Sequence, residues 1–153
     1  MGTGADRASL RARARGSPLE RLILDTTVLI AAERASTAID AVIGDEDDVA
    51  IAAVTVAELM VGVELAHRRR KAARRAFVES LLTTIPIESY DIEVAKVHAI
   101  LLTHTRREGR TRGAHDLLIA ATARARSRTV VTADAAGFDQ LPEVAVRLLP
   151  TVG

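Results

Sequence analysis

The feature that most limits the possible folds is the alternation of short apolar segments with longer helical patterns along the chain. The short segments are rich in Val, Ile and Leu, and the stretches between them repeat apolar residues every three or four positions, as amphipathic helices do. Strands that alternate with helices form a parallel sheet covered by helices on both faces. We therefore expect an α/β domain.

The boundaries follow from these patterns and from the residues that end them. We expect strands at 21–25, 48–52, 84–88, 129–133 and 144–149, and helices at 27–35, 37–43, 55–66, 68–82, 91–107 and 115–127. Thr55 is the expected cap of its helix, Gly109 closes the fifth helix and Gly113 opens the sixth. Pro86 has no N–H to donate, which predicts an edge position for its strand.

The chain has 153 residues, enough for one domain, which we expect to span residues 19–153. Residues 1–18 contain Arg, Ala and Gly without apolar periodicity, and we expect a disordered Arg-rich extension there. The predicted core is aliphatic, because the chain has two Phe, one Tyr and no Trp. So few aromatic residues argue against RNA-binding folds that stack bases on aromatic side chains.

The chain has no cysteine, which excludes disulfides, thiolate zinc sites and a cysteine nucleophile. No apolar run approaches the ~18 residues of a membrane span, and the arginines near the start are followed by Pro and charges rather than by an apolar segment. We expect a cytoplasmic protein without a secretory signal.

The formal net charge of +1 conceals clusters of arginine. Of 21 basic residues only Lys71 and Lys96 are lysines, and the arginines gather near the start and at 67–75, 106–112 and 124–128. Such clusters suit contacts with phosphates, although solvated helix faces have the same composition. The cluster at 67–75 suits RNA and an acidic partner equally.

Four acidic residues lie where the expected elements meet. Asp25 ends the first strand, Asp134 follows the fourth, and Asp116 opens the last helix. Glu58 lies one turn into the helix after the second strand, among apolar neighbours. Because ligand sites in parallel sheets form beyond the carboxyl ends of the strands, we expect these four carboxylates to converge there.

Converging carboxylates repel one another unless a cation neutralises them. Oxygen ligands favour Mg²⁺ or Mn²⁺, and the absence of Cys and of a suitably spaced His pair argues against Zn²⁺. A metal held in this way can activate water and stabilise charge at phosphorus, which predicts phosphodiester hydrolysis.

Each acid also has a simpler interpretation: Asp25 and Asp116 as helix caps, Asp134 as a turn residue and Glu58 as an exposed helix position. Two other functions are open as well. An aspartyl-phosphate enzyme would use Asp25 as nucleophile, but Thr27 stands where haloacid-dehalogenase-like enzymes need a second Asp. A binding module without activity would use only the arginine clusters.

At this point the sequence resembles a known family. The segments "LILDTTVLIAA", "AAVTVAELMVGVELA", "GAHDLLIAATARARSRTVVTADAAGF" and "VAVRLL" are similar to successive blocks of PIN domains in VapC-type toxins. The resemblance covers residues 21–150, and "DLLIAATA" followed by "VVTAD" is its most specific part. It implies a three-layer α/β/α fold with a five-stranded parallel sheet.

The resemblance also implies an endoribonuclease that needs Mg²⁺ or Mn²⁺ and cuts tRNA, rRNA or mRNA. A VapB-type antitoxin would inhibit it, and a homodimer would be usual. The family's metal-binding acids fall on Asp25, Glu58, Asp116 and Asp134, and Thr27 and Thr132 match hydroxyl residues that hold the carboxylates or a water.

Arg110 and Arg112, which approach the helix of Asp116, are the expected contacts with the RNA backbone. His67, His98, His104 and His115 are given no ligand role. The chain departs from the family in its extension at residues 1–18 and at Gly137, where relatives often have an acid or another polar residue.

Overall fold

The computed structural model of the protein describes residues 20–35 and 47–149. The expected extension at 1–18 and the expected helix at 37–43 lie outside the described residues. Within them, no helix is long and apolar enough to cross a membrane.

Five strands form one sheet in which all neighbours are parallel, as predicted. The strand order is β3-β2-β1-β4-β5. The edge position of β3 confirms the prediction from Pro86. The strands are β1 (Arg21–Leu24), β2 (Asp48–Ala52), β3 (Ile87–Glu88), β4 (Thr129–Thr132) and β5 (Val146–Leu148).

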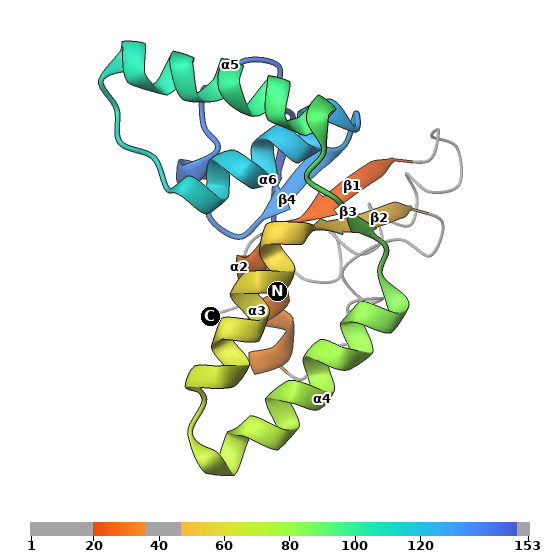
Figure 1. Ribbon diagram of the computed structural model, residues 1–153. Coiled ribbons are helices and arrows are strands. Elements are labelled where there is room, and N and C mark those ends of the chain that lie inside the picture. The colour runs from red at the N-terminus through yellow and green to blue at the C-terminus, as the bar shows by residue number, and fades with distance from the viewer. Residues whose placement is uncertain (1–19, 36–46, 150–153) are drawn as a thin grey trace, which may run out of the picture.

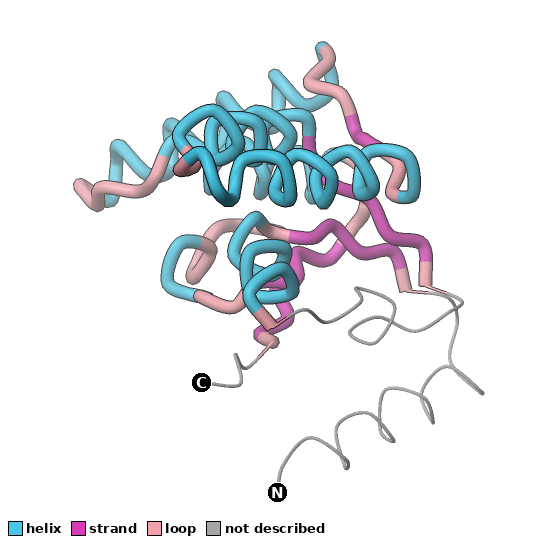
Figure 2. Tube along the Cα trace, turned by 90° about the horizontal axis from the view of Figure 1, so that it is seen from below, coloured by secondary structure: helices cyan, strands magenta, loops and turns pink. Residues whose placement is uncertain are grey.

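Helices cover both faces of this sheet, so the fold has three layers (Figure 1). The helices are α2 (Thr26–Arg34), α3 (Ala53–Leu65), α4 (Arg68–Thr84), α5 (Ile92–Glu108) and α6 (Ala114–Ala125), with a short 3-10 helix, η2 (Ala135–Gly137). Figure 2 shows the strands side by side with the helices packed around them. In Figure 1, α3 and α4 form a hairpin that projects away from the sheet.

Alternating side chains of β1 divide the core between the two faces. Ile23 packs in the cluster with α5 and α6, whereas Leu22 and Leu24 pack in the cluster with α2, α3 and α4. All three are fully buried, as expected for a central parallel strand with helices on both sides.

The predicted helix ends are mostly confirmed, with two corrections. Gly109 closes α5 in the left-handed region, with φ at 64°, and Gly113 precedes α6. The predicted capping role of Thr55 is wrong: α3 begins at Ala53, and Thr55 lies inside it, fully buried. Helix α4 continues to Thr84, so β3 is shorter than predicted.

Candidate active site

The two central strands bring two of the four acids together. Strands β1 and β4 pair directly, and each is followed at its carboxyl end by a helix with an acidic N-cap: Asp25 for α2 and Asp134 for η2. Both acids are therefore caps, which the simpler interpretation of the sequence proposed for Asp25 but not for Asp134, which it gave as a turn residue. A cap can still bind a ligand, because a carboxylate has two oxygens and several lone pairs.

The carboxylate of Asp25 is buried and held from three directions. Asp25 is only 3% exposed. Oδ1 accepts a hydrogen bond from the Thr26 backbone N–H at 2.7 Å, and Oδ2 accepts from the hydroxyls of Thr27 and Thr132, each at 2.8 Å. Hydrogen bonds to a charged group contribute about 1.5–3 kcal/mol each, which offsets the cost of burying the carboxylate.

The same two hydroxyls fasten the loop after β4. The Ala133 N–H donates to the Thr27 hydroxyl at 3.1 Å, and the Asp134 N–H donates to the Thr132 hydroxyl at 3.0 Å. Each hydroxyl can give its one hydrogen to Asp25 and accept a backbone N–H on a lone pair. The position of Asp134 is thus tied to that of Asp25.

Glu58 connects three helices at the same end of the sheet. It lies in the second turn of α3 with its side chain 25% exposed. The Thr26 hydroxyl of α2 donates to Oε1 at 3.1 Å, and Nδ1 of His115, on α6, lies 3.5 Å from Oε2. These contacts direct the Glu58 side chain toward α2 and α6.

Asp116 is the acid whose environment is most unfavourable for a charge. It is the third residue of α6, and its carboxylate accepts no hydrogen bond from the described residues. Burial raises its pKa, and the charges of Asp25, Glu58 and Asp134 raise it further, whereas His115 lowers it. The charges of the other three predicted acids therefore reach Asp116.

The negative charges around Asp116 suit a divalent cation, although the carboxylates do not converge on one point. Within residues 20–35 and 47–149, no three carboxylate or imidazole groups lie close enough together to hold one metal ion. The chemistry of the donors nevertheless suits Mg²⁺ or Mn²⁺: all four are carboxylates, and a cation among them would relieve the repulsion that raises the pKa of Asp116.

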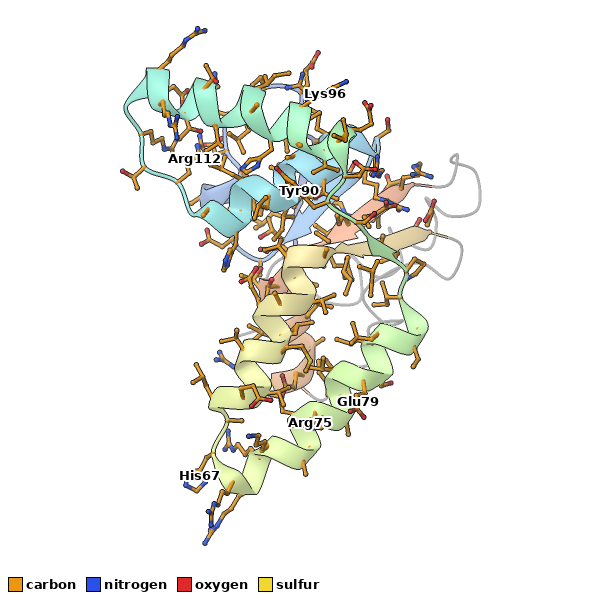
Figure 3. All side chains as sticks on the ribbon, viewed as in Figure 1. His67, Arg75, Glu79, Tyr90, Lys96 and Arg112 are labelled. Carbon is orange, nitrogen blue, oxygen red and sulfur yellow. The ribbon has the colours of Figure 1, made fainter. Side chains whose placement is uncertain are left out.

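The two arginines predicted to contact RNA differ in position. Arg110 is exposed in the connection between α5 and α6. Arg112, beside the same connection (Figure 3), has a side chain only 2% exposed. It donates to the carbonyl oxygens of Gly137, at 3.3 Å, and Asp139. A side chain so buried cannot reach a phosphate, so Arg112 holds the η2 segment instead, and its predicted role is corrected.

Two site residues carried no clear signal in the sequence. The sequence gives Thr26 no role, because its bond to Glu58 depends on how α2 and α3 pack. The structural role of Arg112 depends on a segment 25 residues further along the chain, which a local pattern cannot indicate.

Sequence comparison places the chain among known proteins. The PIN-domain family profile matches residues 22–144. Ribonuclease VapC of Rickettsia bellii is 32% identical over 133 residues, covering 84% of this chain and 96% of that protein. Ribonuclease VapC5 of Mycobacterium tuberculosis is 39% identical over 115 residues, covering 73% and 82%.

Solved structures agree with the sequence matches. VapBC-5 from Mycobacterium tuberculosis, a member of the VapBC family of toxin–antitoxin systems, is 33% identical with a TM-score of 0.68, covering 84% of this chain and 98% of that one. VapBC2 from Rickettsia felis, bound to a DNA fragment from its promoter, has a TM-score of 0.77 and the same coverages. At 22% identity, the second likeness concerns the fold alone.

Proposed function

The chain belongs to the PIN-domain family, and from this membership we propose that it is a VapC-type ribonuclease toxin of a toxin–antitoxin pair. Its reaction would be endonucleolytic hydrolysis of RNA, with a divalent metal ion held by Asp25, Glu58, Asp116 and Asp134. The observation that carries the proposal is the set of contacts that holds the acids at one end of the sheet: Thr27 and Thr132 both donate to Asp25, and Thr26 donates to Glu58.

The residues around the site would divide the work of holding these acids. Thr27 and Thr132 fix the direction of the Asp25 carboxylate, because both donate to the same oxygen. Thr26 turns Glu58 toward the carboxyl end of β1. Asp116 is free of hydrogen bonds from the described residues, so its oxygens remain available to a cation.

Mg²⁺ or Mn²⁺, when bound by these acids, would activate the attacking water and neutralise charge that develops on the phosphate. The protein's own contribution is to hold four negative groups at one end of the sheet against their mutual repulsion. Hydrogen bonds to Asp25 and Glu58 supply part of that energy.

An aspartyl-phosphate mechanism is disfavoured by the surroundings of Asp25. Both of its oxygens already accept hydrogen bonds, and the residue is only 3% exposed. The chain's two lysines lie elsewhere: Lys71 is near Glu64 in the α3–α4 hairpin, and Lys96 is exposed on α5 (Figure 3). A nucleophilic Asp needs a free oxygen directed at the phosphorus.

For substrate and partners, we propose RNA bound through exposed arginines such as Arg110, and inhibition by a VapB-type antitoxin. The toxin–antitoxin complexes among the structural relatives support the second point. A homodimer is the proposed assembly. Which RNA is cut would depend on substrate shape, since the chain has few aromatic residues on which bases could stack.

The test is cleavage of a total-RNA pool by the purified protein with Mg²⁺ or Mn²⁺, with EDTA, and by two variants. Asp116→Asn is the variant that tests the site, because the Asp116 carboxylate accepts no hydrogen bond from the described residues and the fold therefore loses none. Glu79→Gln, on the exposed side of α4 (Figure 3), removes the same charge away from the site.

We expect discrete fragments from the wild type and from Glu79→Gln with metal, and none with EDTA or from Asp116→Asn. Normal cleavage by a folded Asp116→Asn protein would contradict the proposed site. RNA binding that persists in EDTA, with no product under any condition, would favour the binding module instead.

A further inference from the structure

Two glycines enclose the carboxylate of Asp116. A methyl group in place of the Gly137 hydrogen would have its carbon 2.4 Å from Oδ2 of Asp116, and one on Gly113 would lie 3.1 Å from the same oxygen. Carbon and oxygen atoms that are not bonded do not approach to 2.4 Å. The Asp116 carboxylate therefore occupies the space that a side chain at position 137 would need.

The backbone does not require glycine at these positions. Among the described glycines only Gly109 has a positive φ, and Gly113 has an ordinary φ of −60°. A residue with a side chain could adopt either conformation. What the two positions require is the absence of a Cβ atom beside Asp116.

The segment that carries Gly137 is fastened on several sides, so it cannot easily yield. Arg112, itself buried, donates to the carbonyl oxygens of Gly137 and Asp139. Phe138 is 1% exposed in the core, and the Asp134 carboxylate accepts from the Ala136 N–H at 3.1 Å. If a methyl group were added at Gly137, the group that moves would be the Asp116 carboxylate, the free end of a flexible side chain.

We infer that Gly137 is a positioning residue. Because it has no side chain, and because Arg112 holds its backbone, the Asp116 carboxylate can occupy the space beside it and contribute to the acidic site from there. A Cβ atom on Gly113 would make a looser contact with the same oxygen. The consequence for metal binding rests on the proposed function, whereas the packing of Gly137 against Asp116 does not. Residue 137 then controls the direction of a carboxylate without touching substrate or metal.

The test uses three glycine-to-alanine variants at different distances from Asp116. Gly137→Ala and Gly113→Ala add a methyl carbon 2.4 Å and 3.1 Å from Oδ2 of Asp116. Gly62→Ala is the control, because a methyl carbon there would lie 4.0 Å from the Arg74 side chain and away from Asp116. Mn²⁺ affinity is measured by calorimetry on the full chain without RNA. Loss of a group that orients a metal ligand costs roughly 10–100-fold in affinity.

We expect Gly137→Ala to weaken Mn²⁺ binding by about 10-fold or more. Gly113→Ala should have a smaller effect, and Gly62→Ala none. Unchanged Mn²⁺ affinity in a folded Gly137→Ala protein that binds the ion would overturn the inference.

A second measurement needs neither metal nor activity. In EDTA, the Tm change caused by Gly137→Ala is compared in the wild type and in an Asp116→Ala background, as a double-mutant cycle. We expect Gly137→Ala to lower Tm only where Asp116 is present, because with Asp116→Ala the added methyl group meets no carboxylate. An equal loss in both backgrounds would show an ordinary structural role and would overturn the inference.

The two measurements also separate this inference from the proposed function. If the wild type binds no Mn²⁺, the proposed metal site fails, and the Tm cycle alone supports or overturns the positioning of Asp116 by Gly137.

Discussion

Replacing Thr132 with valine should destabilise the protein more than its small size suggests. Thr132 is fully buried at the end of β4, and valine keeps its shape while removing one oxygen. That oxygen donates to Oδ2 of Asp25 at 2.8 Å and accepts the Asp134 N–H at 3.0 Å. Thr132→Val therefore removes a hydrogen bond to a buried carboxylate and a backbone anchor at once.

The expected cost follows from these two contacts. A hydrogen bond to a charged group contributes about 1.5–3 kcal/mol, and a neutral one about 0.5–1.5 kcal/mol. Burying a methyl group instead of a hydroxyl returns roughly 0.8 kcal/mol. We expect a net loss of about 2–3 kcal/mol in the free energy of unfolding, which for a chain of this length lowers Tm by about 5–10 °C.

The assay is urea and thermal unfolding in EDTA, so that metal binding does not contribute. Thr55→Val is the matched control: Thr55 is equally buried, but its hydroxyl has no hydrogen-bond partner in the described structure. The same exchange of atoms should there stabilise the protein, by on the order of 1 kcal/mol.

Asp25→Asn provides the second control, because an amide carries no charge and has one oxygen, so it cannot accept from the Thr26 N–H and from both hydroxyls at once as the two carboxylate oxygens do. In that background Thr132→Val should cost less by on the order of 1 kcal/mol. A loss below about 0.5 kcal/mol in the wild type, or an identical loss in both backgrounds, would refute the reasoning.

Two further outcomes are expected. In metal-free protein, Asp116→Asn should raise Tm at neutral pH: the pKa of Asp116 is raised by burial and neighbouring charges, so the wild type loses stability as pH rises through that raised pKa. The Tm difference between Asp116→Asn and the wild type should vanish below pH 3.8, the ordinary pKa of an aspartate. A Tm difference that stays the same at every pH would contradict this. Arg128→Met should cost about 3 kcal/mol or more in urea unfolding, because the Arg128 side chain, 5% exposed, pairs with Glu88 and Asp48. Arg21→Met removes an ion pair whose arginine side chain is 46% exposed, and it should lower the free energy of unfolding by under about 1 kcal/mol. Equal losses of stability in Arg128→Met and Arg21→Met would argue against the role of burial.

Local patterns were sufficient for most of the fold. The strand at 48–52 was predicted with its observed bounds, and Gly109 and Gly113 mark helix ends as predicted. These succeeded because buried strands are nearly continuous apolar runs and because glycine at a helix end has a direct conformational reason.

The failures came where a residue's role depends on its neighbours in space. Thr55 is of a residue type that often caps helices, but α3 begins two residues earlier, at Ala53, so that Thr55 lies inside the helix. Arg112 lies in an Arg-rich segment that suggests RNA, yet its side chain is buried against the η2 backbone. Neither outcome can be read from the order of residues near these positions.

The sequence by itself determined the parallel α/β/α architecture and the family, and it singled out the four acids whose charges meet at Asp116. It could do so because the period of apolar residues and the direction of parallel strands are local or topological properties. Only the tertiary structure decided how those acids are held: by Thr26 across to Glu58, by Thr132 to Asp25, and by the space beside Gly137 for Asp116. Those contacts join residues far apart in the chain, and their distances depend on the packing of whole helices against the sheet.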